Sequence, residues 1–144
     1  MEGERDFGLE EATIAELGSM LDEGSASARS LGEAYLDRIE QLDGSLDSVI
    51  EVNPQALDIA DAMDRERREG RVGGPLHGIP VMVKDNIATA DRMRTTAGSL
   101  AMTDARPSRD AAVVHRLRDA GAVLLAKTNL SEWANFRSER SSSG

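Results

Sequence analysis

One stretch decides the fold of this chain: Gly73-Gly-Pro-Leu-His-Gly-Ile-Pro-Val-Met-Val-Lys-Asp-Asn86. Residues 79–83 are apolar on both faces, which is typical of a strand inside a helix-covered sheet. Pro80 has no N–H to give to a neighbouring strand, so we expect it at the start of this one. Lys84 ends the run, and two interpretations stay open. It is either a solvated lysine where a strand reaches the surface, or an amine held at the mouth of a buried sheet for chemistry.

A helix is predicted downstream of this stretch. We expect Ser108 to cap it and Gly121 to end it. Val113 and Val114 belong to its apolar positions and are expected on its inner face. The segment before it, residues 87–107, has no clear periodicity, and a loop of this length in a compact domain is often functional.

A second buried strand, residues 122–126, follows the helix and ends in Lys127-Thr-Asn129. Strand, helix and strand predict a right-handed βαβ unit with two parallel strands. Ligand sites in such sheets gather at the carboxyl ends of the strands. Lys84 and Thr128-Asn129 both lie at those ends, which favours a chemical role for the lysine.

The first half of the chain predicts mainly helices. Thr13-Ile-Ala-Glu16 is a capping box, in which the threonine and glutamate side chains satisfy amides at the start of a helix. A second helix is expected to begin near Ser27 and to end at Gly44. Val49-Ile-Glu-Val52 is too short to classify, and Asn53-Pro54 then looks like the N-cap and first residue of a third helix.

Composition excludes several classes of function. A length of 144 residues fits one domain, and a formal net charge of −9 argues against nucleic acid or an anionic membrane as the main partner. The chain has no cysteine, and neither of its two histidines has metal-ligand spacing, so we expect no metal and no cofactor. The acidic start and the lack of a long apolar run predict a soluble, cytoplasmic protein.

Several linked motifs, in one order along residues 73–144, resemble the amidase signature family. The leading helices, including Ala34-Tyr-Leu-Asp-Arg-Ile39, are similar to those of that family too. The motifs are Gly74-Pro-Leu-His-Gly-Ile-Pro-Val-Met-Val-Lys-Asp-Asn86, Arg94-Thr-Thr-Ala-Gly-Ser99, Asp110-Ala-Ala-Val-Val, Ala120-Gly-Ala and Lys127-Thr-Asn-Leu-Ser-Glu-Trp-Ala134.

The resemblance implies an α/β/α fold and hydrolysis of carboxylic amides by a Ser, cis-Ser, Lys triad. Lys84 matches the catalytic lysine of the family. A serine hydroxyl is a poor nucleophile until a base takes its proton, and a lysine can be that base only when it is neutral. Burial disfavours an ammonium, so we expect the apolar run to keep Lys84 out of water. Asp85, Asn86 and Asn129 are expected to hold loops near the site rather than to do chemistry.

The resemblance also implies that the two serines are absent from this chain. In the family they lie in a glycine- and serine-rich segment several tens of residues beyond the position of Ser143. We therefore assign none of Ser141, Ser142 and Ser143 as the nucleophile. The whole chain, residues 1–144, reads as the N-terminal part of one amidase domain, with a mostly helical lead-in (1–72) and the start of a mixed sheet (73–144), and is expected to be inactive alone.

The expected substrates are small or peptide amides, because residues 131–138 are more similar to amidases acting on such amides than to transamidation subunits. Two alternatives stay open. One is the amidase subunit of a tRNA-dependent amidotransferase, with partner subunits. The other is a non-enzymatic module that binds a partner through an unfinished sheet.

Overall fold

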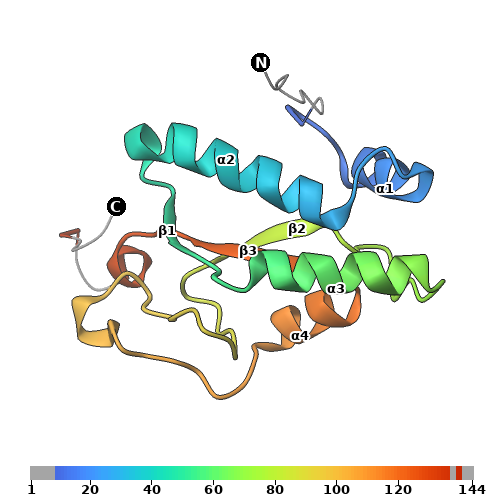
Figure 1. Ribbon diagram of the computed structural model, residues 1–144. Coiled ribbons are helices and arrows are strands. Elements are labelled where there is room, and N and C mark those ends of the chain that lie inside the picture. The colour runs from blue at the N-terminus through green and yellow to red at the C-terminus, as the bar shows by residue number, and fades with distance from the viewer. Residues whose placement is uncertain (1–8, 137–138, 141–144) are drawn as a thin grey trace.

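The computed structural model describes residues 9–136 and 139–140 of the chain, and within them it is an α/β structure with four α-helices and a mixed three-stranded sheet (Figure 1). The predicted fold class is therefore confirmed. The helices are α1 (Ile14–Glu23), α2 (Ala28–Leu46), α3 (Ala56–Arg68) and α4 (Ala112–Asp119). The strands are β1 (Val49–Val52), β2 (Pro80–Lys84) and β3 (Val123–Thr128), and two short turns are η1 (Leu100–Met102) and η2 (Glu132–Asn135).

The central strand of the sheet is β3. It pairs in parallel with β2, as predicted, and in antiparallel with β1, which is the segment that was too short to classify. Asn53 joins the end of β1 to this strand, because its backbone N–H donates to the Leu125 carbonyl over 2.9 Å and its side chain to the Leu124 carbonyl over 2.7 Å. Every residue from Val123 to Lys127 is buried.

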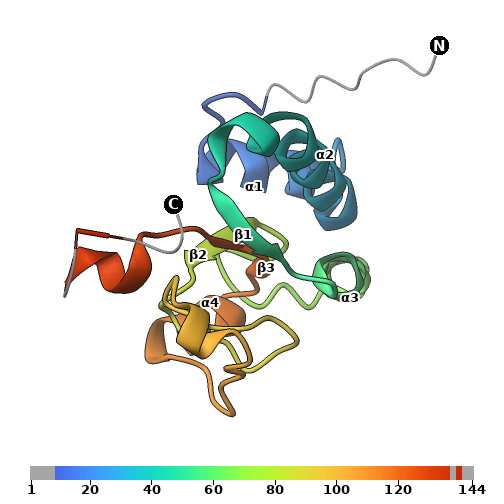
Figure 2. The ribbon, with the colours of Figure 1, turned by 90° about the vertical axis from the view of Figure 1, so that its left-hand side faces the viewer.

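One face of the sheet carries α1 and α2 (Figure 2). Leu17 and Leu21 of α1, with Leu31 of α2, pack into a core cluster that includes Val123 of the central strand. The helix α3 packs against α2 and contacts β3. Asp64 of α3 also accepts hydrogen bonds from the first two amides of α2, over 2.7 and 3.0 Å, and so ties the two helices together.

The opposite face is covered by α4 and by the long segment after β2 (Figures 1 and 2). Its core cluster consists of Val83, Met93, Val114 and Leu124. Val114 is fully buried as predicted, but Val113 is 50% exposed, so the expected inward position of Val113 is wrong.

The start of α4 also differs from the prediction. The helix begins at Ala112, with Ala111 as an N-cap that makes no side-chain hydrogen bond, so Ser108 does not cap it. After α4 the chain turns at Gly121, which has a φ of 85°. A Cβ at Gly121 would lie 2.6 Å from the His77 Cα, so this close approach to the loop before β2 requires glycine.

Two helix starts in the first half follow the predicted caps, whereas the third start and one helix end do not. The helix α3 begins at Ala56 with Gln55 as its N-cap, so the expected N-cap at Asn53 and first helical residue at Pro54 are wrong. The capping box of Thr13 and Glu16 is present, and Ser27 caps α2 in the same way with Ser30. The helix α2 passes through Gly44 and ends at Leu46, with Asp47 in the left-handed conformation. No helix among the described residues is both long and apolar enough to cross a membrane.

Candidate active site

Both lysines of the chain lie at the carboxyl ends of the parallel strands. Lys84 is the last residue of β2 and pairs with Thr128, while Val83 pairs with Lys127. Neighbouring residues of a strand project to opposite faces of the sheet. The two amines therefore point away from each other: Lys127 shares a face with Val83, and Lys84 shares the other with Met82.

Lys84 is exposed among the described residues, so the expectation that the apolar run keeps it out of water is wrong for this chain. The cause is the position of β2, an edge strand of which Met82 is also 45% exposed. Val83 packs into the core cluster beside Val114 of α4, whereas Met82 and Lys84, which point to the other face of β2, are both exposed. The catalytic role of Lys84 stays a prediction.

The buried lysine is Lys127, which is 0% exposed. Its amine donates three hydrogen bonds to the segment after β2. The acceptors are the Ile87 carbonyl at 2.9 Å, the Arg94 carbonyl at 3.1 Å and the Thr95 hydroxyl at 2.8 Å. An ammonium has three N–H donors, so each one is satisfied.

Asp85 is the counter-charge of this buried amine. Its Oδ1 lies 3.8 Å from the Lys127 Nζ, and both side chains are almost completely buried. Its Oδ2 accepts hydrogen bonds from the Thr96 backbone at 3.1 Å and from the Thr96 hydroxyl. Burial lowers the pKa of Lys127, and the nearby carboxylates of Asp85, Asp91 and Glu51 oppose that shift.

The other residues expected near the site lie around these strand ends. Asn129 follows β3, and its side-chain amide donates to the Asp47 carbonyl over 2.9 Å, which links it to the segment before β1. Asn86 is exposed at the turn after β2. The three serines 141–143 lie outside the described residues.

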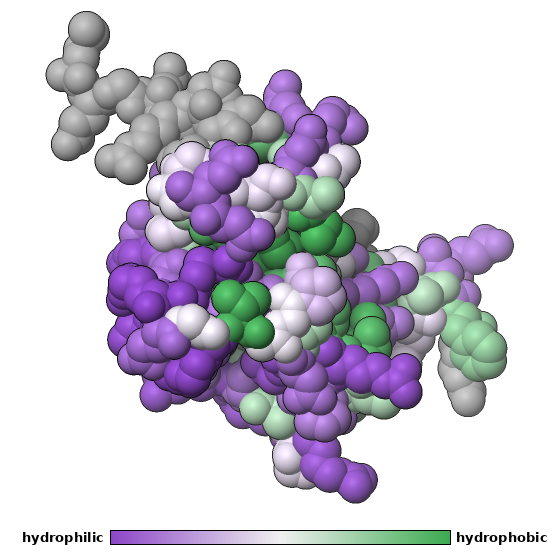
Figure 3. Space-filling view, turned by 90° about the vertical axis from the view of Figure 1, so that its right-hand side faces the viewer, coloured by the Kyte–Doolittle hydropathy of each residue, from purple (hydrophilic) through white to green (hydrophobic). Residues whose placement is uncertain are grey.

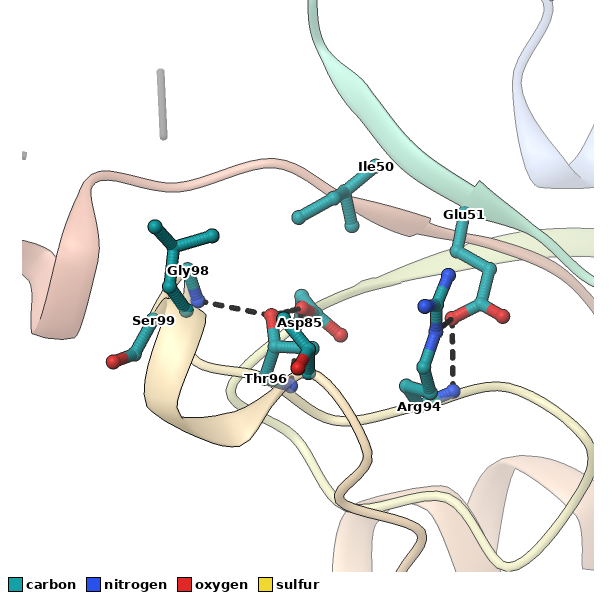
Figure 4. Close-up of a pocket in the computed structure, with 9 residues that line it drawn as sticks. Ile50, Glu51, Asp85, Arg94, Thr96, Gly98 and Ser99 are labelled. Atoms are coloured by element: carbon teal, nitrogen blue, oxygen red, sulfur yellow. Dashed lines mark hydrogen bonds and ion pairs between the residues drawn. The ribbon is translucent and has the colours of Figure 1, made fainter. Parts of the chain in front are cut away.

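A pocket of about 180 Å³ opens beside Asp85 (Figure 4). Its wall is formed by the middle of β1 and by residues between Arg94 and Thr103. An ion pair of Glu51 with Arg94, 3.4 Å long, lies on one side of it. The lining residues are Ile50, Glu51, Asp85, Arg94, Thr96, Gly98, Ser99, Leu100 and Thr103.

This end of the sheet has charges and hydroxyl groups but no cluster suited to a metal ion within the described residues. The buried His77 lies three residues before β2, at the opposite end of that strand from Lys84, and its ring is bonded to the Met63 carbonyl and the Gly73 amide. The site therefore has an exposed amine at Lys84. The loop that follows Lys84 is held by hydrogen bonds from the buried amine of Lys127.

Comparison with known proteins places this geometry in a family. The family described as Amidase matches residues 30–144 of the chain. The solved structure of native peptide amidase from Stenotrophomonas maltophilia is 54% identical, with a TM-score of 0.86, over 91% of this chain and 27% of that one.

Curated relatives also include amidases and a related amidotransferase subunit. A protein of Arabidopsis thaliana described as a probable amidase is 47% identical over 134 residues, which are 92% of this chain and 26% of the relative. A glutamyl-tRNA(Gln) amidotransferase subunit of Thermobifida fusca is 45% identical over 123 residues, which are 85% of this chain and 24% of the relative. The chain thus spans about a quarter of the length of these relatives, and it belongs to the amidase signature family.

Proposed function

We propose that the complete protein hydrolyses the C–N bond of carboxylic amides to an acid and ammonia or an amine, with Lys84 as general base. The observation that supports this most is the place of Lys84. In a chain of the amidase family, this lysine ends a parallel strand beside the end of β3, where ligand sites of such sheets lie.

In this mechanism a middle serine relays the proton from the nucleophilic serine to Lys84, and backbone amides stabilise the oxyanion. Both serines would come from residues that this chain does not hold. Those same residues would have to cover the Lys84 side chain, because a lysine can act as a base only when it is neutral and burial favours the neutral amine. The chain alone is therefore expected to be inactive.

The proposed substrates are small or peptide amides. The support is the 54% identity to peptide amidase over most of this chain. A net charge of −9 also disfavours a nucleic-acid partner, because its phosphates would be repelled.

A second candidate is the amidase subunit of a tRNA-dependent amidotransferase. The 45% identity to the glutamyl-tRNA(Gln) amidotransferase protein of Thermobifida fusca favours it specifically. Activity on free amides without any partner subunit discriminates between the two, because the amidase needs no partner.

The test is ammonia release from peptide amides by the complete gene product and by its Lys84→Met variant. We expect the variant to lose at least about a thousandfold in kcat/KM, the scale on which a general base acts. Arg116→Met is the matched control, since it removes an exposed cation from α4 instead of from β2.

Three outcomes would contradict the proposal. Equal activity of the Lys84→Met variant and the wild type would remove the general-base role. Ammonia release by the 144-residue chain itself, lost on Lys84→Met, would show that the serines lie within it. A folded, monodisperse gene product that ends at Gly144 and has no activity would favour the partner-binding module.

A further inference from the structure

The amine of Lys127 connects β3 to both ends of one loop segment. Ile87 lies near the start of the segment that follows β2, and Arg94 and Thr95 lie at its far end, seven and eight residues later. One buried amine thus gathers two carbonyls and a hydroxyl that the sequence separates. No other described cation is as completely buried.

The backbone around Asp85 continues this connection to Lys84. The Asp85 amide donates to the Thr128 carbonyl over 3.1 Å, and the Ala97 amide donates to the Asp85 carbonyl over 3.0 Å. The Ile87 amide donates to the Lys84 carbonyl over 2.9 Å. The residue that follows Lys84 is therefore fixed on both sides, to β3 and to the far end of the loop.

Lys127 has no access to a substrate, because it is 0% exposed and projects to the face opposite Lys84. A buried charge of this kind is costly unless it is paired and hydrogen-bonded. Here it is paired with Asp85 and donates to three acceptors. Such a network fixes the position of the groups it joins.

We propose that Lys127 is a positioning residue: with Asp85, it locks the loop 85–97 onto β3 and thereby fixes the end of β2 that presents Lys84. This inference rests on the proposed function of Lys84. Lys127 takes no proton in the reaction. Instead, Lys127 fixes the position of the backbone at the end of β2, which carries Lys84.

The first test is hydrogen exchange, followed by mass spectrometry, on the complete gene product and its Lys127→Met variant. Methionine keeps the length of the side chain and removes all three donors. We expect exchange in peptides from residues 85–97 to rise about tenfold, since hydrogen bonds to a charged group are lost. Peptides from α2 and α3 should be unchanged, and a uniform rise throughout the chain would overturn the proposal.

A second variant separates two possible roles of Lys127: holding the loop 85–97 in place, and neutralising the buried Asp85 carboxylate. Lys127→Met alone leaves the Asp85 carboxylate buried and unpaired, so the double variant Asp85→Asn with Lys127→Met removes that charge as well. The asparagine oxygen can still accept from Thr96. If Lys127 anchors the loop, the double variant still exchanges fast at 85–97. Restoration to wild-type exchange would reduce Lys127 to a counter-charge and overturn the proposal.

Thr95→Val is the mild variant for the case in which Lys127→Met does not fold. It keeps both charges and removes one acceptor of the amine. We expect a rise in exchange at 85–97 of about threefold, the size of one lost hydrogen bond. No change in this peptide would contradict the proposed anchoring.

Steady-state kinetics of the same variants then show whether holding the loop 85–97 in place affects catalysis. With Lys127→Met we expect kcat to fall about a hundredfold at a nearly unchanged KM, as for a catalytic group held slightly out of place. Unchanged kcat with a mobile loop would overturn the positioning role. Full activity of Lys84→Met would instead refute the proposed function, while the exchange data would still decide whether Lys127 anchors the loop.

Discussion

At the scale of single residues, the two lysines should differ sharply in reactivity. An amine-acylating reagent reaches Lys84, which is exposed, but not Lys127, which is fully buried and hydrogen-bonded. We expect a short treatment of the folded chain to modify the peptide that contains Lys84 and to leave Lys127 unmodified, as read by mass spectrometry. In urea both should react at similar rates. Equal reaction in the folded chain would contradict the burial of Lys127.

The pH dependence of stability gives a second prediction for Lys127. Burial lowers its pKa in the folded chain below the ordinary value of 10.5. Between the folded pKa and 10.5 the unfolded chain binds more protons, so the free energy of unfolding rises with pH there. Below the folded pKa both states are protonated and the contribution is constant.

The measurement is urea unfolding of the wild type and of Lys127→Met at several pH values from neutral to 10.5. The wild type should gain stability relative to the variant as the pH rises through this window. The difference in unfolding free energy between wild type and variant cancels the contributions of other groups that titrate in this range. One of these is Tyr35, because burial raises its pKa. A difference that is flat or falls with pH would contradict a buried ammonium at position 127.

The sequence indicated where the site residues lie, but not which lysine is buried. Two apolar runs that end in polar residues were enough to place Lys84 and Lys127 at the carboxyl ends of two neighbouring parallel strands. Burial depends on the order of the strands, and nothing local to either run shows that β3 is central and β2 is at an edge. The acceptors of Lys127 come from residues 87–95, a segment without periodicity, so no pattern could reveal them.

At the scale of secondary-structure elements, the capping box of α1 carries a prediction. The Glu16 pKa lies below its ordinary value of 4.5, because the backbone amide and then the hydroxyl of Thr13 donate to the carboxylate. Thr13→Ala removes the hydroxyl and should lower the free energy of unfolding by about 1 kcal/mol. Thr13→Ser keeps the hydroxyl and is the control.

Two measurements check this cap. Chemical denaturation gives the loss in stability, and a carboxyl NMR titration should show the pKa of Glu16 moving up toward its ordinary value in Thr13→Ala. If Thr13→Ala and Thr13→Ser behave alike in both measurements, the side-chain cap does not contribute.

The two helix starts with a capping box, those of α1 and α2, were predicted correctly, and the reason is physical. A capping box places both partners within four residues, so the sequence contains the whole interaction at Thr13 and at Ser27. Gly44 looked like a helix end, but Asp47 takes the left-handed conformation and its amide bonds to the Asp43 carbonyl instead. The start of α4 has no side-chain cap at all, so residue preferences near Ser108 were misleading.

At the scale of the whole molecule, the described part of the chain leaves apolar side chains at its surface. Figure 3 shows one face on which hydrophilic side chains dominate and hydrophobic areas interrupt them. The most exposed large apolar residues include Leu100 at 73% and Phe136 at 83%. Sequence motifs identified the family across this chain, which spans about a quarter of the length of its relatives, but they did not show which surfaces of the described residues stay exposed.

The open edge of β2 leads to a prediction for the isolated chain. An edge strand presents unpaired backbone groups, and exposed apolar residues beside it promote pairing with a second copy. Met82, 45% exposed on this strand, is such a residue. We expect self-association of the purified chain in sedimentation experiments. It should be stronger at high salt, which screens the repulsion between molecules of net charge −9.

A pair of charge variants tests whether the edge is responsible. Met82→Glu places a charge on β2, as natural edge strands do, and should shift the chain toward monomer. Val113→Glu adds the same charge at a residue that is 50% exposed on α4, so it controls for the change in net charge. If both variants reduce association equally, net charge and not the edge governs it. If only Met82→Glu does so, the surface beside Lys84 is the one that the isolated chain leaves without a partner.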